Sequence, residues 1–314
     1  MKKYISDLAE YVYKIVSECN GTIKNRQVNG VSYGGDAQFD IDNVAEEAVL
    51  EFIKNSQVDI AYYSEDTGLT VFGENPQYLL IIDPIDGTRP MAAGFEMSCI
   101  SIAVAEFKPD AKLKDIKFAL IKELKTGASM FADANENGIE YKGYKTRLPN
   151  LNKNADLKHM FWAFEFNGHP TKLMIDAYGD IIDSSANTGG VFLFNSASYA
   201  ISRIITGQLD AFVDIGNRIL KDNLELLSEF KRVGNGAVLH LFPYDIAAVV
   251  LIAKKAGVVI TDAYGNSLDE MKLMDPSYQN QQSCIAASTQ NLHNEIIKSI
   301  NWEANKQLSV PSNA

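Results

Sequence analysis

The stretch Tyr78–Thr88, with the sequence YLLIIDPIDGT, does most to decide the fold of this chain. Its first five residues are apolar and typical of a buried β-strand. Proline cannot donate to a strand ladder, so we expect the strand to end at Asp83-Pro84. Asp83 and Asp86 then leave the strand in a turn and lie close together. Two adjacent carboxylates repel each other unless a proton or cation lies between them, and oxygen ligands suit Mg²⁺.

Other acidic residues lie where predicted elements begin or end. Glu65 follows the apolar run 60–63, Asp42 lies near the start of a helix that carries 44–53, and Asp245 opens a helix over 246–256. Asp40 or Asp42 can cap the first of these helices, and each acid alone is typical of an ordinary cap, turn or surface position. Gly87 lets the backbone approach a ligand, and the amides of Gly87 and Thr88 would face an anion if they opened a helix.

Helical and strand patterns alternate along the rest of the chain, which favours a layered α/β or α+β fold. Ser196 is a predicted helix cap, and Gly207 and Gly257 are predicted helix ends. A polar region at 133–156 is the predicted boundary between two halves. The remaining predicted elements are helices at 2–19, stopped by Asn20-Gly21, and 196–206, and strands at 99–106, 128–132, 209–215 and 258–261.

Composition excludes several classes of function. The chain has 314 residues and a net charge of −11, which argues against non-specific binding to nucleic acid or an anionic membrane. The longest aliphatic run, 246–253, is far shorter than the ~20 residues that span a bilayer. Charges interrupt the N-terminal apolar residues, and the three cysteines are widely spaced, so we expect reduced thiols and a cytoplasmic protein.

These motifs resemble the inositol monophosphatase family of lithium-sensitive, magnesium-dependent phosphatases, which is related to fructose-1,6-bisphosphatase. The first family signature is found at 81–88 with 98–103 behind it, and the second at 244–248 through Gly257. Between them, 196–197 and 206–212 are similar to a later helix and strand of the family. Gly34-Gly35, followed by Asp36 and Asp42, matches its N-terminal loop and helix. The likeness covers most of 1–290 and is nearest to the archaeal-type branch that accepts both inositol phosphates and fructose bisphosphate.

The resemblance implies an α+β fold, a layered α-β-α-β-α sandwich, and a homodimer. Residues 1–145 would form an N-terminal α+β half with the Asp-Pro-Ile-Asp-Gly-Thr motif. Residues 146–314 would form a C-terminal α/β half that supplies Asp245 and the substrate wall.

The resemblance also implies a role for each matching residue. Two or three Mg²⁺ ions would be bound, one by Glu65, Asp83 and the Ile85 carbonyl and a second by Asp83, Asp86 and Asp245. Thr88, oriented by Asp42, and Glu65 would be the catalytic residues that activate a water molecule. The implied substrate-binding residues are Asp86, Gly87, Thr88, Ser196, Ala197 and Asp214, and we add Arg218 as a candidate for a second phosphate.

Some features depart from the family pattern. Arg89-Pro90 and Gln38 replace residues that are more usual there, and Gly216 stands where a basic residue is expected. The link from Gly216 to Phe242 is about twenty residues longer than usual, and the sequence leaves open whether it is a lid, an oligomer contact or a surface elaboration. The four histidines are scattered without ligand spacing, so no role is assigned to them.

The function predicted from these residues is Mg²⁺-dependent hydrolysis of a small phosphorylated polyol or sugar, such as inositol 1-phosphate or fructose 1,6-bisphosphate. Two alternatives stay open at this point. One is a nucleotidase acting on 3′-phosphoadenosine 5′-phosphate, and the other is a non-catalytic protein of the same fold that binds metal or inositol phosphate.

Overall fold

A computed structural model describes residues 1–19 and 26–303, so the predicted helix stop at Asn20-Gly21 lies outside the described residues. A seven-stranded sheet has the order β4-β3-β5-β6-β7-β8-β9, in which only β3 and β5 pair in parallel. The strands are β3 (Ile60–Ser64), β4 (Gly68–Phe72), β5 (Tyr78–Asp86), β6 (Cys99–Glu106), β7 (Ile116–Glu123), β8 (Ser129–Asp133) and β9 (Glu140–Lys142).

A second sheet has five strands in the order β11-β10-β12-β14-β13. β10 runs parallel to both of its neighbours, and β14 is antiparallel to β12 and β13. These strands are β10 (Phe161–Phe164), β11 (Gly190–Phe192), β12 (Ala211–Asp214), β13 (Val259–Thr261) and β14 (Cys284–Ala287). The chain passes from the first sheet to the second between β9 and β10, and the boundary between the two halves stays a prediction.

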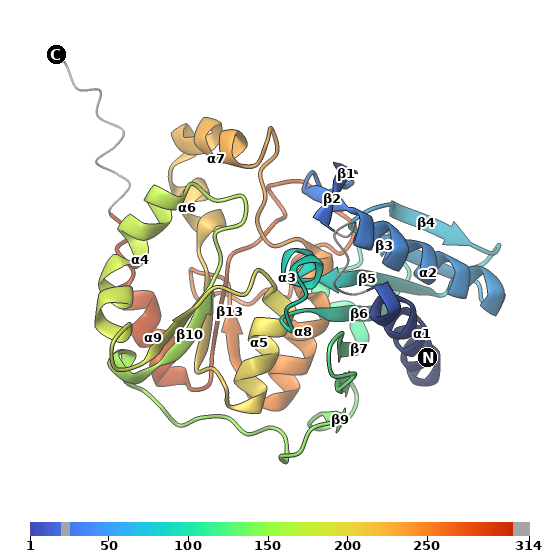
Figure 1. Cartoon of the computed structure of the whole chain (residues 1–314), viewed down its shortest axis with the longest axis horizontal. Helices are drawn as coiled ribbons and strands as arrows, with labels where there is room; N and C mark the ends of the chain where they lie inside the picture. The colour runs from blue at the N-terminus through green and yellow to red at the C-terminus, as the bar shows by residue number, and fades with distance from the viewer. Residues whose placement is uncertain (20–25, 304–314) are drawn as a thin grey trace.

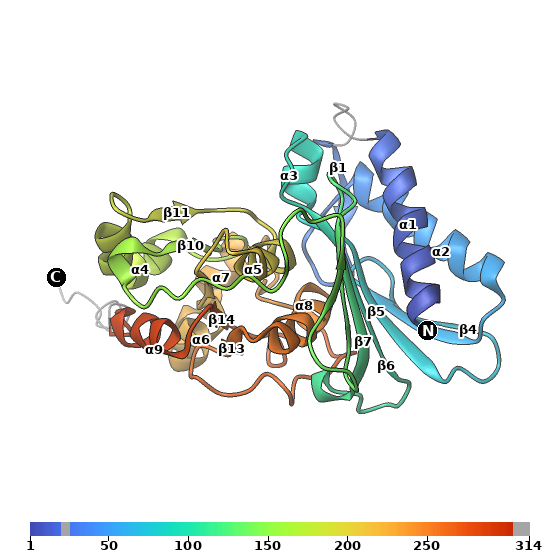
Figure 2. The same ribbon diagram turned by 90° about the horizontal axis from the view of Figure 1, so that it is seen from below.

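The helices form three layers around the two sheets (Figures 1 and 2). α1 (Lys2–Cys19) and α2 (Asp40–Ser56) cover one face of the seven-stranded sheet, and α5 (Ala197–Thr206) and α8 (Pro243–Ala256) lie between the sheets. α4 (Thr171–Ser185) and α9 (Gln290–Ser299) cover the outer face of the five-stranded sheet. The predicted α-β-α-β-α sandwich is therefore confirmed. Within the described residues, no helix is long and apolar enough to cross a membrane.

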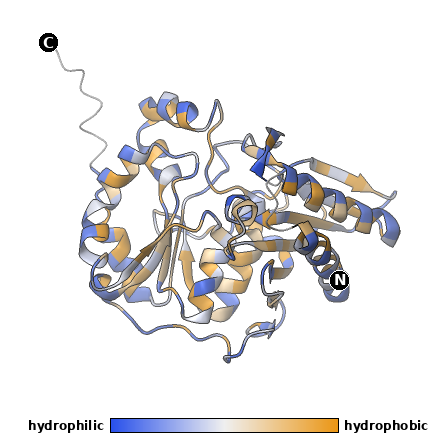
Figure 3. Cartoon of the chain, viewed as in Figure 1, coloured by the Kyte–Doolittle hydropathy of each residue, from blue (hydrophilic) through white to orange (hydrophobic). Residues whose placement is uncertain are grey.

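Burial on both faces of the central strands explains their continuous apolar sequence. In β5, Leu80 and Ile82 pack against the α1 and α2 layer, whereas Leu79 and Ile81 pack toward α8. Successive strand residues point to opposite faces, so a strand covered on both sides needs apolar residues at every position. Figure 3 shows the same distribution, with hydrophobic residues along the strands and on the inner sides of the helices.

Three shorter segments lie outside the two large sheets and the helix layers. β1 (Val28–Val31) and β2 (Ala37–Phe39) form a separate two-stranded sheet. α3 (Thr88–Ala93) follows β5 directly. The link from 216 to 242 forms α6 (Gly216–Asp222), a 3₁₀ turn (Leu224–Leu226) and α7 (Leu227–Val233).

Candidate active site

Eleven of the twelve predicted site residues line one pocket between the two halves. β5 and α3 supply Asp83, Ile85, Asp86, Gly87 and Thr88, and the starts of α2, α5 and α8 supply Asp42, Ser196, Ala197 and Asp245; Glu65 follows β3 and Asp214 ends β12. Only Arg218 is absent from this pocket.

The Asp-Pro-Ile-Asp segment is not the end of a strand, as the sequence predicted, but a bulge within it. Asp83 pairs with Ser101 of β6 and Asp86 with Cys99, so β5 has an extra residue here. Pro84 is accommodated because a bulge leaves a residue without a ladder partner. The bulge turns both carboxylates into the pocket.

Gly87 is required by both conformation and space. Its φ angle of 96° lies in the left-handed region, which favours glycine. A Cβ atom there would lie 2.5 Å from the Met97 carbonyl oxygen and 2.9 Å from the Ser196 Cβ. Any larger residue would therefore displace the backbone at Met97 or the start of α5.

Asp42 and Asp245 have the same position in their helices. Neither is the N-cap that the sequence predicted, because the cap residues are Phe39 and Phe242 and each aspartate is the third helical residue. Asp42 Oδ2 accepts from the Phe39 amide at 2.9 Å, and Asp245 Oδ2 accepts from the Phe242 amide at 2.6 Å. One oxygen of each carboxylate thus fixes the helix start. The other oxygen of Asp42 lies within hydrogen-bond distance of the Thr88 hydroxyl, and that of Asp245 is available to the pocket.

Thr88 is oriented as the resemblance implied. Its hydroxyl lies 2.8 Å from Asp42 Oδ1 and 3.1 Å from the Ile85 carbonyl oxygen, and it donates its single hydrogen to one of them. The lone pairs of the hydroxyl oxygen then remain to accept a hydrogen bond from the pocket.

The carboxylates of the pocket destabilise one another's charged forms. Burial and then the charges of Asp86, Glu65 and Asp245 raise the pKa of Asp83 well above its usual range. Burial raises the pKa of Asp42 to about 6 and that of Asp86 to about 6, although hydrogen bonds to both carboxylates oppose the shift. Protons or cations bound in the pocket would relieve this repulsion.

The donor set fits a hard cation, because the carboxylates offer only oxygen. Asp83 Oδ1 accepts from the Ile85 amide at 2.9 Å, and Asp86 Oδ2 accepts from Ser196 Oγ at 2.8 Å and from the Ser198 amide at 2.6 Å. These bonds leave the second oxygen of each carboxylate for another partner. Within residues 1–19 and 26–303, no group of three His, Cys, Asp or Glu side chains lies close enough together to hold a metal ion.

Arg89, a departure from the family pattern, binds an acid that sequence reasoning did not assign to the site. Its guanidinium donates to both oxygens of Asp36, at 2.8 and 3.1 Å. Asn167 also donates to Asp36, at 3.0 Å. Arg89 is the only lysine or arginine among the described residues that line the pocket, and its charge is already matched.

One wall of the pocket contains residues that sequence reasoning missed. Glu165, His169 and His240 line it together with the predicted Asp214. His169 Nε2 lies 3.1 Å from His240 Nδ1, although the two residues are 71 positions apart. The spacing of the two histidines in the sequence does not indicate this contact, which is seen only in the folded structure.

The prediction that Arg218 contacts substrate is wrong in its placement. The guanidinium carbon lies 3.6 Å from the centre of the Trp302 ring and 4.5 Å from that of Tyr264. Its nitrogen atoms bind the Ala263 carbonyl oxygen at 2.7 Å and Asp222 at 3.3 Å. Stacking and hydrogen bonding hold the side chain on α6, away from the pocket.

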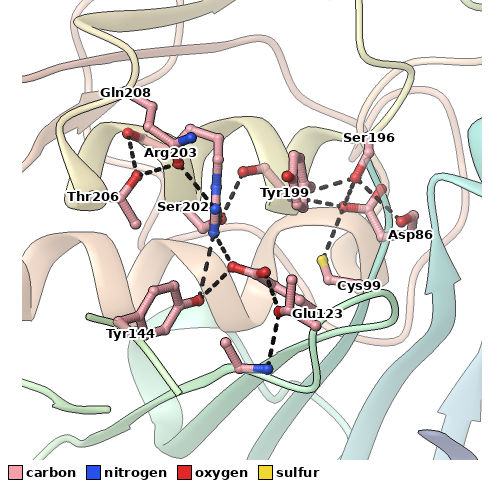
Figure 4. Close-up of polar contacts among 12 residues, drawn as sticks. Asp86, Cys99, Glu123, Tyr144, Ser196, Tyr199, Ser202, Arg203, Thr206 and Gln208 are labelled. Carbon is pink, nitrogen blue, oxygen red and sulfur yellow. Dashed lines mark hydrogen bonds and ion pairs between the residues drawn. The ribbon is translucent and has the colours of Figure 1, made fainter. Parts of the chain in front are cut away.

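A buried network behind the pocket holds α5 in place (Figure 4). The Tyr199 amide donates to Asp86 of β5 at 3.2 Å, and the Arg203 guanidinium lies over the Tyr199 ring at 4.5 Å. Arg203 forms an ion pair with Glu123 of β7, and Tyr144 donates to the same carboxylate at 2.7 Å. α5 is therefore attached to two strands of the seven-stranded sheet.

Comparisons with known proteins agree with this geometry. The family model described as the inositol monophosphatase family matches residues 2–304. A fructose-1,6-bisphosphatase/inositol-1-monophosphatase from Methanothermobacter thermautotrophicus is 23% identical over 300 residues, which cover 93% of this chain and 94% of that protein. A bifunctional NADP phosphatase/NAD kinase from Methanococcus maripaludis is 22% identical over 93% of this chain and 47% of its own length, so the chain spans about half of that relative.

A solved structure gives the same result for the fold. A hypothetical protein from Pyrococcus horikoshii, described as having similarities to inositol-1 monophosphatase, matches with a TM-score of 0.68 at 20% identity. The match covers 95% of this chain and 97% of that one.

Proposed function

Because the chain belongs to the inositol monophosphatase family, we propose that it hydrolyses phosphate monoesters of small polyols or sugars, with inositol 1-phosphate and fructose 1,6-bisphosphate as candidate substrates. The enzyme class, a phosphoric monoester hydrolase, follows from the family. The relatives named as phosphatases do not favour the two alternatives, a 3′-phosphoadenosine 5′-phosphate nucleotidase or a non-catalytic binding protein.

The observation that carries the proposal is the charge of the pocket. Nine of the described lining residues are acidic, and Arg89 is the only lysine or arginine among them. A phosphate monoester is a dianion and would be repelled from such a pocket on its own. We therefore propose that two or three Mg²⁺ ions accompany the substrate, held by Glu65, Asp83, Asp86, Asp245 and the Ile85 carbonyl. When bound, they would stabilise the attacking and leaving oxygens of an in-line displacement.

The residues of the chain would position the reactants. Thr88, held by Asp42, would accept a hydrogen bond from the attacking water, and Glu65 would take its proton. The raised pKa of Glu65, caused by burial and by the charges of Asp245 and Asp36, supports a role in proton transfer. The amides of Gly87 and Thr88 would hold phosphate oxygens, while Ser196, Ala197 and Asp214 would contact the alcohol part of the ester.

Inhibition by lithium and a homodimeric state are proposed on the same resemblance, and a cytoplasmic location is proposed from the sequence. The wide spacing of the three cysteines in the sequence supports a reducing compartment.

A phosphate-release assay tests the function. Chelator-treated protein should release phosphate from inositol 1-phosphate only after Mg²⁺ is added. Release that does not depend on a divalent ion, or no release from a panel of polyol and sugar phosphates, would contradict the proposal.

A further inference from the structure

The long link between Asp214 and Asp245 ends inside the active-site pocket. Ile219, Leu220 and Phe230 of the link are buried in the core beneath the five-stranded sheet. The link then runs through 239–242, which line the pocket. It is therefore a packed part of the fold, and it carries His240 to the pocket wall that also contains Glu165 and His169.

Both histidine rings on this wall are held in place. The His240 amide donates to Gln281 Oε1 at 2.9 Å, and the His169 amide donates to the Phe166 carbonyl oxygen at 2.8 Å. The Phe230 ring packs edge-on against both imidazoles, at 5.2 Å from His240 and 6.1 Å from His169. The hydrogen bond between the two rings is thus part of a fixed structure.

Gly216 makes room for this arrangement. A Cβ atom on Gly216 would lie 2.5 Å from two atoms of the His169 ring. The basic residue expected there from the family pattern would therefore displace His169. The chain has an imidazole in the space that a cationic side chain would need.

The two rings together present one donor and one acceptor. A neutral imidazole has one of each, and the bond between His169 Nε2 and His240 Nδ1 uses one donor and one acceptor. Whichever ring donates, one of the two remaining nitrogens carries hydrogen and the other does not. These nitrogens, His169 Nδ1 and His240 Nε2, are buried and have no hydrogen-bond partner among the described residues.

The acids beside the pair add oxygen atoms for hydrogen bonds but no positive charge. Among the described residues, neither carboxylate oxygen of Glu165 has a hydrogen-bond partner of normal geometry. Burial raises the pKa of Glu165, and the nearby amides of Asn195 and Ser196 oppose this shift only in part. Asp214 lies 3.9 Å from His169 Nε2. The charge of Lys221 acts on His240, but Lys221 does not line the pocket.

From this arrangement we infer that Glu165, His169 and His240 form a subsite for uncharged hydroxyl groups of the substrate's alcohol part, and that this subsite disfavours a second phosphate. A hydroxyl both donates and accepts, so it satisfies the pair and the carboxylates. A phosphate dianion only accepts, and here it would face two carboxylates with no free cation on the described lining. The inference rests on the proposed phosphatase function and names the substrate class of its site.

Three esters test the subsite: inositol 1-phosphate, p-nitrophenyl phosphate, which has no hydroxyl, and fructose 1,6-bisphosphate. With Mg²⁺, H240F should lower kcat/KM for inositol 1-phosphate by about tenfold, mainly through KM, because a buried hydroxyl loses its partner. For p-nitrophenyl phosphate the change should stay below about threefold. H240Q, which keeps a donor and an acceptor, should recover part of the loss.

His159 offers a matched control, because it is exposed and lies outside the pocket, so H159F should match wild type on all three esters. Melting temperatures show whether H240F folds, and H240L serves in its place if it does not. Equal losses on inositol 1-phosphate and p-nitrophenyl phosphate, no loss on either, or a wild-type preference for the bisphosphate would overturn the subsite. A wild type that hydrolyses none of the esters would instead refute the proposed function, and the subsite with it.

Discussion

Without metal, the protein should become more stable when the pH falls from about 8 to about 5.5. Asp42 and Asp86 have pKa values of about 6, and Asp66 of about 7, against an ordinary value of 3.8. At pH values between the ordinary pKa and the raised pKa of an acid, the folded chain binds more protons than the unfolded chain. Unfolding therefore becomes less favourable as the pH falls. This stabilisation is lost as the pH rises through 6 to 7.

The size of the effect follows from the shifts. Between pH 8 and 5.5, Asp66 with its pKa of about 7 contributes about 2 kcal/mol, and Asp42 and Asp86 contribute about 1 kcal/mol each, because their pKa values of about 6 lie near the end of this range. Contributions of neighbouring acids do not add, because protonating one relieves the others. His240 and His293 oppose the trend, since burial lowers their pKa values, but the raised acids outnumber them. A net gain of about 3 kcal/mol would raise the melting temperature by roughly 5 °C in a chain of this size.

Mg²⁺ should replace the protons. At 100 times its dissociation constant, an ion bound only to the folded state adds about 2.7 kcal/mol per site. Because protons compete with the metal, the increase in melting temperature on adding millimolar Mg²⁺ should be larger at about pH 8 than at about pH 5.5.

Thermal melts at both pH values, with chelator or with Mg²⁺, measure these effects. D180N is a suitable control, because Asp180 is exposed and lies outside the pocket, and it should behave as wild type. A chelator-treated protein that loses stability on acidification, or an equal Mg²⁺ effect at both pH values, would refute the electrostatic argument.

Three substitutions give further expectations. D83N should lower kcat by more than tenfold, a loss above about 1.4 kcal/mol, because a neutral amide cannot bridge two dications. Steady-state rates with Mg²⁺ measure this loss, and a variant that kept more than a tenth of the wild-type kcat would count against two-metal binding. T88A should keep the increase in melting temperature on adding Mg²⁺ but slow hydrolysis, since only water positioning is lost; an altered Mg²⁺ dependence at an unchanged rate would reverse these roles. G216A should lower the free energy of unfolding by about 1–3 kcal/mol in denaturant titrations, because the added methyl group would clash with the His169 ring. Equal or higher stability, which is the usual effect of Gly→Ala within a helix, would show that the imidazole moves easily.

The sequence predicted the parts of the site that depend on neighbouring residues. The spacing of Asp83 and Asp86 after an apolar run indicated two adjacent carboxylates, and both line the pocket. The cap at Ser196 is confirmed, because its side chain accepts from the Tyr199 amide. Such features are decided within a few residues of chain, where backbone geometry and propensity act.

Predictions from neighbouring residues were wrong where contacts between distant parts of the chain decide the structure. Pro84 suggested the end of a strand, but β6 continues to pair beyond a bulge. The aspartates at 42 and 245 suggested helix caps, but phenylalanine residues occupy the cap positions. Glu165 and the pair of His169 and His240 are brought together only by the packing of the link, so no local pattern could indicate them.

The attachment of α5 has a consequence for how the protein unfolds. The helix packs on β12 of the second sheet, while its Arg203 reaches Glu123 of the first, and a single apolar core runs through both. Separating the halves would break this ion pair and expose the shared apolar core to water, and the exposure of the core opposes the separation. Calorimetry should therefore find one cooperative transition, with equal calorimetric and van't Hoff enthalpies, for a chain that contains two sheets.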